Sequence, residues 1–318
     1  MNRRNVFKKT DVAWGVLFVV AVFASLGLGA TRGLEWSLVK ELRLPRTLLA
    51  FAVGAALSIG GTILQSLFKN PLCEPYTLGV SSGATLGAVI GSSLGLNTLF
   101  FGLSPSALVG ALLFSGILWL VSRMRRLSSS TLLLVGIMLG FLGSSWVAVW
   151  MTLADPAGIQ SALGWLLGDL SRAETTNALF MNGAVALIFL GVYRDHRGYD
   201  VLLMGEEEAV SVGLDLRAFR IKTILWTSLL VSVAVSLAGM IGFVGLIVPQ
   251  LVRRSGSALH RRVLPLSALV GGTVLIIADT VSRTIAAPYE LPVGVVTAIA
   301  GAPFFIALLF FGKRNRES

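Results

Sequence analysis

Long stretches without a charged side chain are the feature that most constrains this sequence. Residues 75–122 contain no Asp, Glu, Lys or Arg over 48 positions, and residues 223–252 contain none over 30. Soluble domains carry about 25% charged residues, whereas this chain has 13% charged and 55% hydrophobic residues and a mean hydropathy of +0.82. Because a helix needs about 20 apolar residues to cross a bilayer, the pattern predicts an all-α polytopic membrane protein and nearly excludes a soluble enzyme.

The uncharged stretches give the expected spans. Residues 75–122 have room for two helices around a Gly-, Asn- and Pro-containing break near 95–105, whereas residues 223–252 are too many for one helix and too few for two. We therefore expect nine full spans and one short, broken or re-entrant helix, which makes ten transmembrane helices. The stretches are 12–31, 47–68, 75–122, 127–154, 175–193, 223–252, 263–278 (extended past Asp279) and 291–312.

The first stretch follows Arg3, Arg4, Lys8 and Lys9, a pattern that also opens signal peptides. Its apolar run is longer than the usual apolar region of a signal peptide, and the sequence at its end is a poor cleavage site. We therefore expect a retained helix. Because no long polar stretch interrupts the chain, residues 1–318 are expected to form a single transmembrane domain.

The distribution of positive charge predicts the orientation, because cytoplasmic loops are rich in Lys and Arg. With the N-terminus inside, the run 123–126, the segment 194–222, the segment 253–262 and the C-terminal residues all fall inside. Both termini are then cytoplasmic. Of the 26 Lys and Arg residues, 20 lie inside, and the six outside are Arg32, Lys40, Arg43, Arg46, Arg172 and Arg283.

The segments before and after residues 223–252 are both assigned to the cytoplasmic side. This stretch must therefore enter the membrane and return to the side from which it started. Gly239, Gly242, Gly245 and Pro249 supply the expected break. Broken helices are tolerated in membranes only where protein or a water-filled cavity receives the freed backbone groups.

Residues that could carry covalent chemistry are few. One cysteine, Cys73, and two histidines, His196 and His260, leave no basis for a disulfide framework or a Cys/His metal site, and we expect no cofactor. The sequence has no G-x-x-x-x-G-K-[ST] motif, so ATP hydrolysis, if it drives transport, belongs to another polypeptide. The G-x-S-x-G match at 79–83 lacks a base, since both histidines are expected in cytoplasmic loops; a glycine every four residues from 79 to 95 favours helix packing instead.

Arg43 and Arg46 flank Leu-Pro on the outside, just before the second span. Each arginine alone is most simply an interfacial anchor, but the outside is poor in basic residues. Together with Arg283, outward guanidiniums would suit the capture of carboxylates on an acidic partner. Asp279 lies well inside a span, and we favour an ion pair with Arg283 one turn on over a functional intramembrane acid.

Two inner segments also stand out. Pro71 and Pro75 forbid a continuous helix over 68–75, which forms either a simple turn or a constriction. Residues 205–213 predict a short helix with acids at its N-terminus and a glycine at its end. This helix is either a solvated loop helix or a docking helix for a cytoplasmic partner.

The sequence resembles the permease family of ABC importers for ferric siderophores, haem and cobalamin. No one motif is decisive, but their order and spacing are specific, and they cover nearly the whole chain. They are R-L-P-R at 43–46, G-A-A-L-S-I-G-G-T-I-L-Q-S-L-F-K-N-P-L-C-E-P at 54–75, L-G-V-S-S-G-A at 78–84, L-L-L-V-G at 132–136, L-G-W-L-L-G at 163–168, M-G-E-E-E-A-V-S-V-G-L at 204–214, G-F-V-G-L-I-V-P-Q at 242–250, A-D-T-V-S-R at 278–283 and E-L-P-V-G-V-V-T-A-I-A-G-A-P-F-F at 290–305.

The resemblance implies a non-catalytic permease of the type II importer fold in the cytoplasmic (inner) membrane of a prokaryote, working as a homodimer. Two cytoplasmic ATP-binding subunits would dock on the segment 194–222, and an extracytoplasmic substrate-binding protein would dock outside through glutamates. No nucleic acid is implied as a partner; membrane lipid surrounds the chain. The implied docking residues are Arg43, Arg46 and Arg283; the implied coupling residues are Gly205, Glu206, Glu207, Glu208, Ala209, Gly213 and Leu214; the implied cytoplasmic gate is Asn70, Leu72, Ser129 and Ser130.

This chain departs from the family pattern at two positions. Gln250 stands where the family often has His, and Cys73 occupies a small position in N-P-L-C-E-P. The implied cargo is a metal chelate, with ferric siderophore first, then haem and cobalamin. The rival classes are an ion-coupled secondary transporter, which one intramembrane acid disfavours, and an intramembrane enzyme, which would need a convergent catalytic set.

Overall fold

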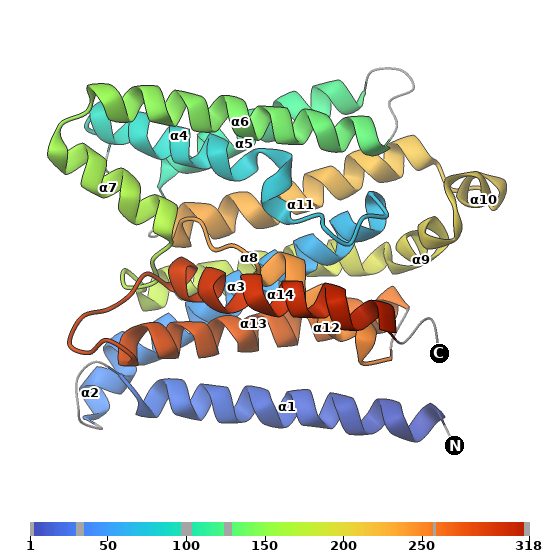
Figure 1. The fold of residues 1–318 in the computed structure, drawn as a ribbon, viewed down its shortest axis with the longest axis horizontal. Helices are drawn as coiled ribbons and strands as arrows, with labels where there is room; N and C mark the ends of the chain where they lie inside the picture. The colour runs from blue at the N-terminus through green and yellow to red at the C-terminus, as the bar shows by residue number, and fades with distance from the viewer. Residues whose placement is uncertain (1–2, 30–34, 97–103, 124–128, 257–258, 315–318) are drawn as a thin grey trace.

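The computed structural model describes residues 3–29, 35–96, 104–123, 129–256 and 259–314, and these form a bundle of helices (Figure 1). Both termini lie at one end of the bundle with α9 and α10, here called the termini end; α2 and α7 lie at the opposite end. The predicted break near 95–105 and the basic run 123–126 lie partly outside the described residues. Arg32 and the last four residues, 315–318, lie wholly outside them. The elements are α1 (Arg3–Gly27), α2 (Trp36–Leu38), the π-helical turn η1 (Val39–Arg43), α3 (Leu44–Leu67), the 3-10 turn η2 (Pro75–Leu78), α4 (Val80–Ser93), α5 (Pro105–Ser122), α6 (Ser129–Leu153), α7 (Pro156–Leu167), α8 (Thr175–Arg194), α9 (His196–Met204), α10 (Glu206–Ser211), α11 (Leu216–Ala238), α12 (Val244–Arg254), α13 (His260–Thr284) and α14 (Val293–Arg314).

The all-α prediction is confirmed for the described residues, and each expected stretch contains at least one helix. Among these residues, seven helical segments are long and apolar enough to cross a membrane. They contain α1, α3, α5, α6, α8, α11 and α13, whereas α4 and α14 are shorter apolar helices and α12 has 11 residues. The count of ten transmembrane helices therefore stays a prediction.

Helix α3 forms the centre of the bundle. It packs on α13, α11, α8 and α12, and nearly all of its residues are buried. Small residues allow this close approach: a Cβ at Gly54 would overlap the backbone of Gly271 on α13, and one at Gly61 would overlap Gly245 on α12. By contrast, α1 runs along the edge of the bundle (Figure 1).

The predicted break in 223–252 is confirmed, and it lies between Ala238 and Val244. Gly239 (φ 68°) and Phe243 (φ 71°) both have left-handed backbone conformations there. Two residues that were expected to supply the break, Gly245 and Pro249, lie inside α12 instead.

Proline is tolerated inside α12 because another side chain serves the carbonyl that it frees. Pro249 has no N–H to donate to the Gly245 carbonyl; Gln65 of α3 donates from Nε2 to that oxygen (3.4 Å) and to Leu246 O (3.1 Å). Gln250, where the family often has His, donates to Gln65 Oε1 at 2.8 Å. The polar face of α12 is therefore fixed to α3.

The glycine stripe packs helices together, as predicted. A Cβ at Gly83 or Gly87 of α4 would overlap atoms of α5, and one at Gly79 would overlap Leu139 of α6. Gly95, in contrast, has no described atom within 4 Å of such a Cβ. The G-x-S-x-G match is thus part of a packing surface.

Helix α7 was not predicted. It has standard start and stop signals, since Asp155 accepts a hydrogen bond from Gly158 N at 3.1 Å, Pro156 is the first residue and Gly168 (φ 70°) follows the end. A search for stretches of about 20 apolar residues does not find a helix of 12 residues.

Candidate coupling and gating site

The predicted coupling segment forms a helix pair, α9 and α10, at the termini end (Figure 1). Gly205 separates the two helices, and Glu206, Glu207 and Glu208 form the first turn of α10, where the helix dipole favours acids. This short helix was predicted, and its existence is confirmed. Its end is also as predicted, because Gly213 follows it with φ 89°.

The packing of α10 leaves most of it accessible. Ala209 is buried, and its carbonyl accepts a hydrogen bond from Leu214 N at 3.0 Å. Val210 and Val212, in contrast, are 57% and 69% exposed. These two valines leave an apolar rim at the end of α10.

Glu206 joins the predicted coupling segment to the predicted gate. Its Oε1 accepts a hydrogen bond from Ser129 Oγ at 2.8 Å and forms an ion pair with Arg220 at 2.6 Å. Partial burial raises the pKa of Glu206, but the hydrogen bonds from Ser129 and Arg220 and the charges of Arg220 and Lys69 outweigh it and hold the pKa below its ordinary value. Glu206 is therefore an anion at neutral pH, fixed between α6 and α11.

The second part of the predicted gate lies in the connection between α3 and η2. Asn70 Oδ1 accepts from Leu72 N at 2.9 Å, which is the local turn that Asn favours before Pro. Leu72 is 51% exposed. The charge of the preceding Lys69 acts on Glu206, so this connection lies near the Ser129 contact, while Ser130 is exposed.

A buried polar network ties α9 to the transmembrane core. Asp200 of α9 accepts from His260 N at 2.7 Å and contacts Nδ1 of the same ring at 2.7 Å. His260 Nε2 lies 2.7 Å from Ser66 Oγ on α3, and Arg253 of α12 donates to that oxygen at 2.9 Å. A neutral ring can donate from Nδ1 to Asp200 and accept at Nε2 from Ser66. The single hydroxyl proton of Ser66 has a second acceptor in the Thr62 carbonyl at 2.8 Å.

This network corrects one expectation. His260 was expected in a cytoplasmic loop, but it is the first residue of α13 and is fully buried. Ser66, His260 and Asp200 have the connectivity of a catalytic triad; however, both Ser66 and His260 are 0% exposed. The geometry therefore supports a structural role, in which these side chains and Arg253 hold α3, α9, α12 and α13 together.

At the opposite end, Asp279 is the centre of an ion-pair network. Its predicted pair with Arg283 is confirmed at 3.1 Å. Asp279 also accepts from Arg46 Nε at 2.8 Å, and Arg46 in turn binds Glu290 at 2.7 Å. Asp279 is 0% exposed, which fits the rule that buried charges are paired.

The three arginines predicted to dock a partner all have partners within the chain. Arg43 donates to the carbonyls of Leu26 (2.9 Å) and Gly27 (3.1 Å) at the end of α1. Arg283 donates to Ser25 Oγ at 2.8 Å. Arg43, Arg46 and Arg283 are 4%, 8% and 3% exposed, so they do not point outward as expected, and docking through them stays a prediction.

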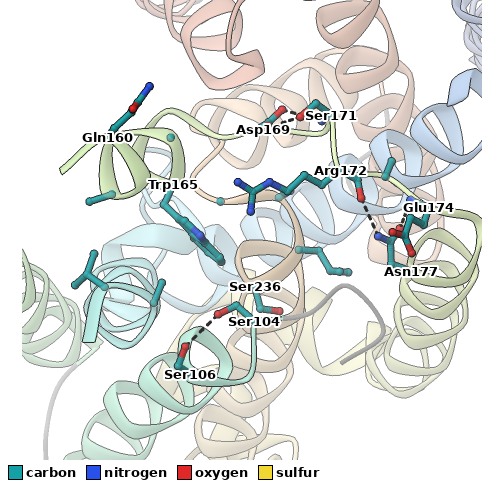
Figure 2. Close-up of a pocket in the computed structure, with 18 of the residues that line it drawn as sticks. Ser104, Ser106, Gln160, Trp165, Asp169, Ser171, Arg172, Glu174, Asn177 and Ser236 are labelled. Carbon is teal, nitrogen blue, oxygen red and sulfur yellow. Dashed lines mark hydrogen bonds between the residues drawn. The ribbon is translucent and has the colours of Figure 1, made fainter. Parts of the chain in front are cut away.

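A cavity of about 1000 Å³ lies at the same end of the bundle, between α4, α5, α7 and α11. Figure 2 shows the Trp165 ring and the Arg172 guanidinium reaching toward the middle of this space. Two of the three acids that line it, Asp169 and Glu174, are engaged locally, with Ser171 and with Asn177 respectively; the third is Glu41. Sequence reasoning missed the cavity because its walls come from distant segments.

No group of three or more His, Cys, Asp or Glu side chains that could hold a metal occurs among the described residues. Sequence reasoning also missed Arg220 and Asp200. Both are ordinary charges in a cytoplasmic segment, and only the fold brings them to Glu206 and His260.

Comparisons with known proteins agree on one family. The FecCD transport family matches residues 12–311. The hemin transport system permease protein HmuU of Yersinia pestis is 34% identical over 318 residues, which is 95% of this chain and 95% of the relative. The vitamin B12 import system permease protein BtuC of Escherichia coli O9:H4 is 36% identical over 323 residues, covering 96% and 98%. A solved inward-facing structure of a metal-chelate type ABC transporter superposes with a TM-score of 0.86 at 29% identity, covering 97% of this chain and 99% of that one.

Proposed function

This chain belongs to the FecCD transport family, and from that premise we propose that it is the transmembrane permease subunit of an ATP-binding-cassette importer that moves a metal chelate across the cytoplasmic membrane. The chain itself performs no covalent step. ATP binding and hydrolysis occur in two separate subunits, which dock on the α9–α10 pair. Energy from these subunits switches the permease between outward-open and inward-open states.

The Ser129–Glu206 contact is the observation that carries this proposal. A coupling helix must bias the gate through a physical connection if a distant ATPase is to control it. Glu206 begins α10, and Ser129 begins α6. The 2.8 Å hydrogen bond between them joins the proposed ATPase surface to the proposed gate. When α10 moves, Ser129 is displaced with it or released.

The gate, in this proposal, consists of Ser129 and Ser130 at the start of α6 together with Asn70 and Leu72. All four lie at the termini end. We infer that this end is cytoplasmic because α9, α10 and the arginine-containing end of α12 lie there, and the sequence assigns these segments to the side rich in Lys and Arg. Both termini are then cytoplasmic. Closure of the gate would bring these small polar residues and Leu72 together with their counterparts in a second copy of the chain across the path.

An extracytoplasmic binding protein would dock at the opposite end. Glutamates of that protein would compete with Asp279 and Glu290 for the guanidiniums of Arg46 and Arg283, and with helix-end carbonyls for Arg43. Bidentate Arg–carboxylate pairs are strong enough for such an exchange. Docking would then loosen the network around Asp279 and signal that cargo has arrived.

An ion-coupled secondary transporter is the alternative. Such a carrier needs an intramembrane acid that exchanges protons or ions with water. Asp279 is buried and paired with two arginines, which makes it a poor exchanger. The importer is the better-supported function.

The cargo is proposed as a ferric siderophore, with haem and cobalamin next. The relatives named for hemin and vitamin B12 support the class of large chelates, but not one member of it. The decisive experiment is uptake into vesicles that contain the chain, its ATPase subunits and its binding protein, with a ferric hydroxamate, hemin and cyanocobalamin as labelled probes. ATP-dependent uptake of one probe is expected, and uptake of none of the three would contradict the proposal.

A further inference from the structure

The break between α11 and α12 lies deep in the bundle. Helix α12 has 11 residues and ends at the termini end with Arg254, so its start lies about 16 Å from that end at a rise of about 1.5 Å per residue. That depth is about half of the roughly 30 Å apolar core of a bilayer. The polar backbone groups of residues 239–243, here called the break segment, therefore need partners within the protein.

The first set of partners comes from the wall of the cavity. Met240 N donates to Trp165 O at 3.1 Å, and Asp169 N donates to Ala238 O at 2.9 Å. Trp165, Asp169 and Ala238 all line the cavity. The cavity wall and the break segment thus share backbone hydrogen bonds, and a displacement of α7 displaces the break segment.

The second set comes from the connection that carries the gate. Ile241 N donates to the Tyr76 hydroxyl at 2.9 Å, and Phe243 N donates to Glu74 Oε1 at 2.6 Å. Glu74 is two residues past Leu72 of the proposed gate. The two sides of the break segment are therefore held by two different structures, the cavity wall and the gate connection.

Close packing keeps the break segment from moving independently. A Cβ at Gly168 would overlap the Met240 carbonyl oxygen, and one at Gly294 of α14 would lie 2.8 Å from the same oxygen. Gly301 of α14 similarly packs against Phe243. Because packed interiors are stiff and rearrange between discrete states, this arrangement passes a displacement from one side to the other.

We propose that Glu74 and Tyr76 are positioning residues of the transport cycle, which hold the break segment so that the outer cavity and the inner gate change state together. This inference rests on the proposed function. It adds a second route of control: the α9–α10 pair acts on the gate from the cytoplasm through Ser129, and the cavity acts on it from outside through the break segment. Cargo in the cavity would thereby be sensed at the gate before ATP is used.

The first test compares conservative variants in the assembled importer. Tyr76→Phe removes one oxygen and leaves the Ile241 N–H without its partner. We expect uptake per ATP hydrolysed to fall about tenfold, in keeping with the loss of one buried hydrogen bond, with normal assembly. Tyr193→Phe removes the same oxygen from a tyrosine whose ring stacks on His196, and should not change this ratio.

Two substitutions of Glu74 separate the loss of its hydrogen bond from the loss of its charge. Glu74→Gln keeps an acceptor oxygen for Phe243 N–H and should retain uptake per ATP within about twofold, whereas Glu74→Ala should lose about tenfold. Equal ratios in Glu74→Gln and Glu74→Ala, or a wild-type ratio in Tyr76→Phe, would overturn the proposal.

The second test needs neither ATPase nor cargo, so it separates this inference from the proposed function. Cys73 is the single cysteine of the sequence and is 1% exposed, so its rate of labelling by a maleimide in the purified full chain reports on the gate connection. Gly164→Trp fills the cavity from a position with no described atom within 4 Å of the new Cβ. We expect it to change the labelling rate at least about threefold in the wild type and less than about twofold in Tyr76→Phe.

The outcomes of this double-mutant cycle are distinct. An equal change of the labelling rate in both backgrounds, or no change in the wild type, would refute the coupling of the cavity to the gate through the break segment. If labelling behaves as expected while vesicles show no ATP-driven uptake, the connection stands and the proposed function fails.

Discussion

Asp279→Asn should destabilise the fold, because Asp279 is the negative centre of a buried network. The variant keeps the size of the side chain but leaves the guanidiniums of Arg46 and Arg283, now 2.8 and 3.1 Å from a carboxylate, without their common counterion. Removal of one partner from a buried ion pair costs about 3–5 kcal/mol. We expect a loss near 3 kcal/mol, at the low end of that range, since Arg46 keeps Glu290 and Arg283 keeps Ser25.

The assay is the free energy of unfolding in mixed micelles, titrated with a denaturing detergent. Asp155→Asn is the matched control, because Asp155 caps α7 at an exposed position where Asn is about as good as Asp. Adding Arg283→Gln to Asp279→Asn should recover about 1 kcal/mol or more, since removing both partners costs less than removing one. A loss for Asp279→Asn within about 1 kcal/mol of the control would refute the reasoning.

The remaining predictions concern coupling and docking. Ser129→Ala should lower uptake per ATP about tenfold, at the low end for loss of a hydrogen bond to a charged group, because Glu206 keeps Arg220. An unchanged ratio would count against the contact. The fold lowers the pKa of Glu206, so the ionised carboxylate contributes to stability above the ordinary Glu pKa of about 4.3, and this contribution is lost as the pH falls through the lowered pKa. The free energies of unfolding of wild type and Glu206→Gln should therefore converge at low pH. A difference that stays constant with pH would contradict this prediction. Gly213→Val should uncouple ATPase activity from uptake, since Gly213 has φ 89°. Gly183→Val is the control, because a Cβ at Gly183 of α8 meets no described neighbour within 4 Å, and equal coupling in both variants would be the contrary result. Arg43→Glu should weaken the docking of the binding protein and make it less dependent on salt, measured by co-sedimentation with vesicles, and wild-type docking by the folded variant would remove Arg43 from the contact.

The sequence predicted the features that depend on local pattern. Uncharged stretches predicted the helices. The break in 223–252 was predicted because positive charge places both ends of this stretch on the cytoplasmic side. The acids and glycines of 205–213 predicted α10. Each of these follows from the periodicity, length or charge of neighbouring residues.

The features that the sequence could not supply depend on contacts between distant residues. Asp279 was matched with Arg283, four residues away, but Arg46 lies 233 residues away in the chain and no local rule identifies it. The arginines of 43–46 were expected to face outward, yet they turn inward because α1 and α13 present carbonyls and a carboxylate to them. The role of Glu74 similarly depends on the N–H of Phe243, which precedes α12 and lies 169 residues away in the chain.

In the proposed function, this chain is a membrane pathway whose energy comes from other subunits. The most direct measurement is solute accumulation in vesicles that hold the purified chain, compared with and without the ATPase subunits and ATP, under an imposed ion gradient. We expect accumulation against a concentration gradient only when the ATPase subunits and ATP are both present. Uphill transport by the chain alone, driven by the ion gradient, would contradict it.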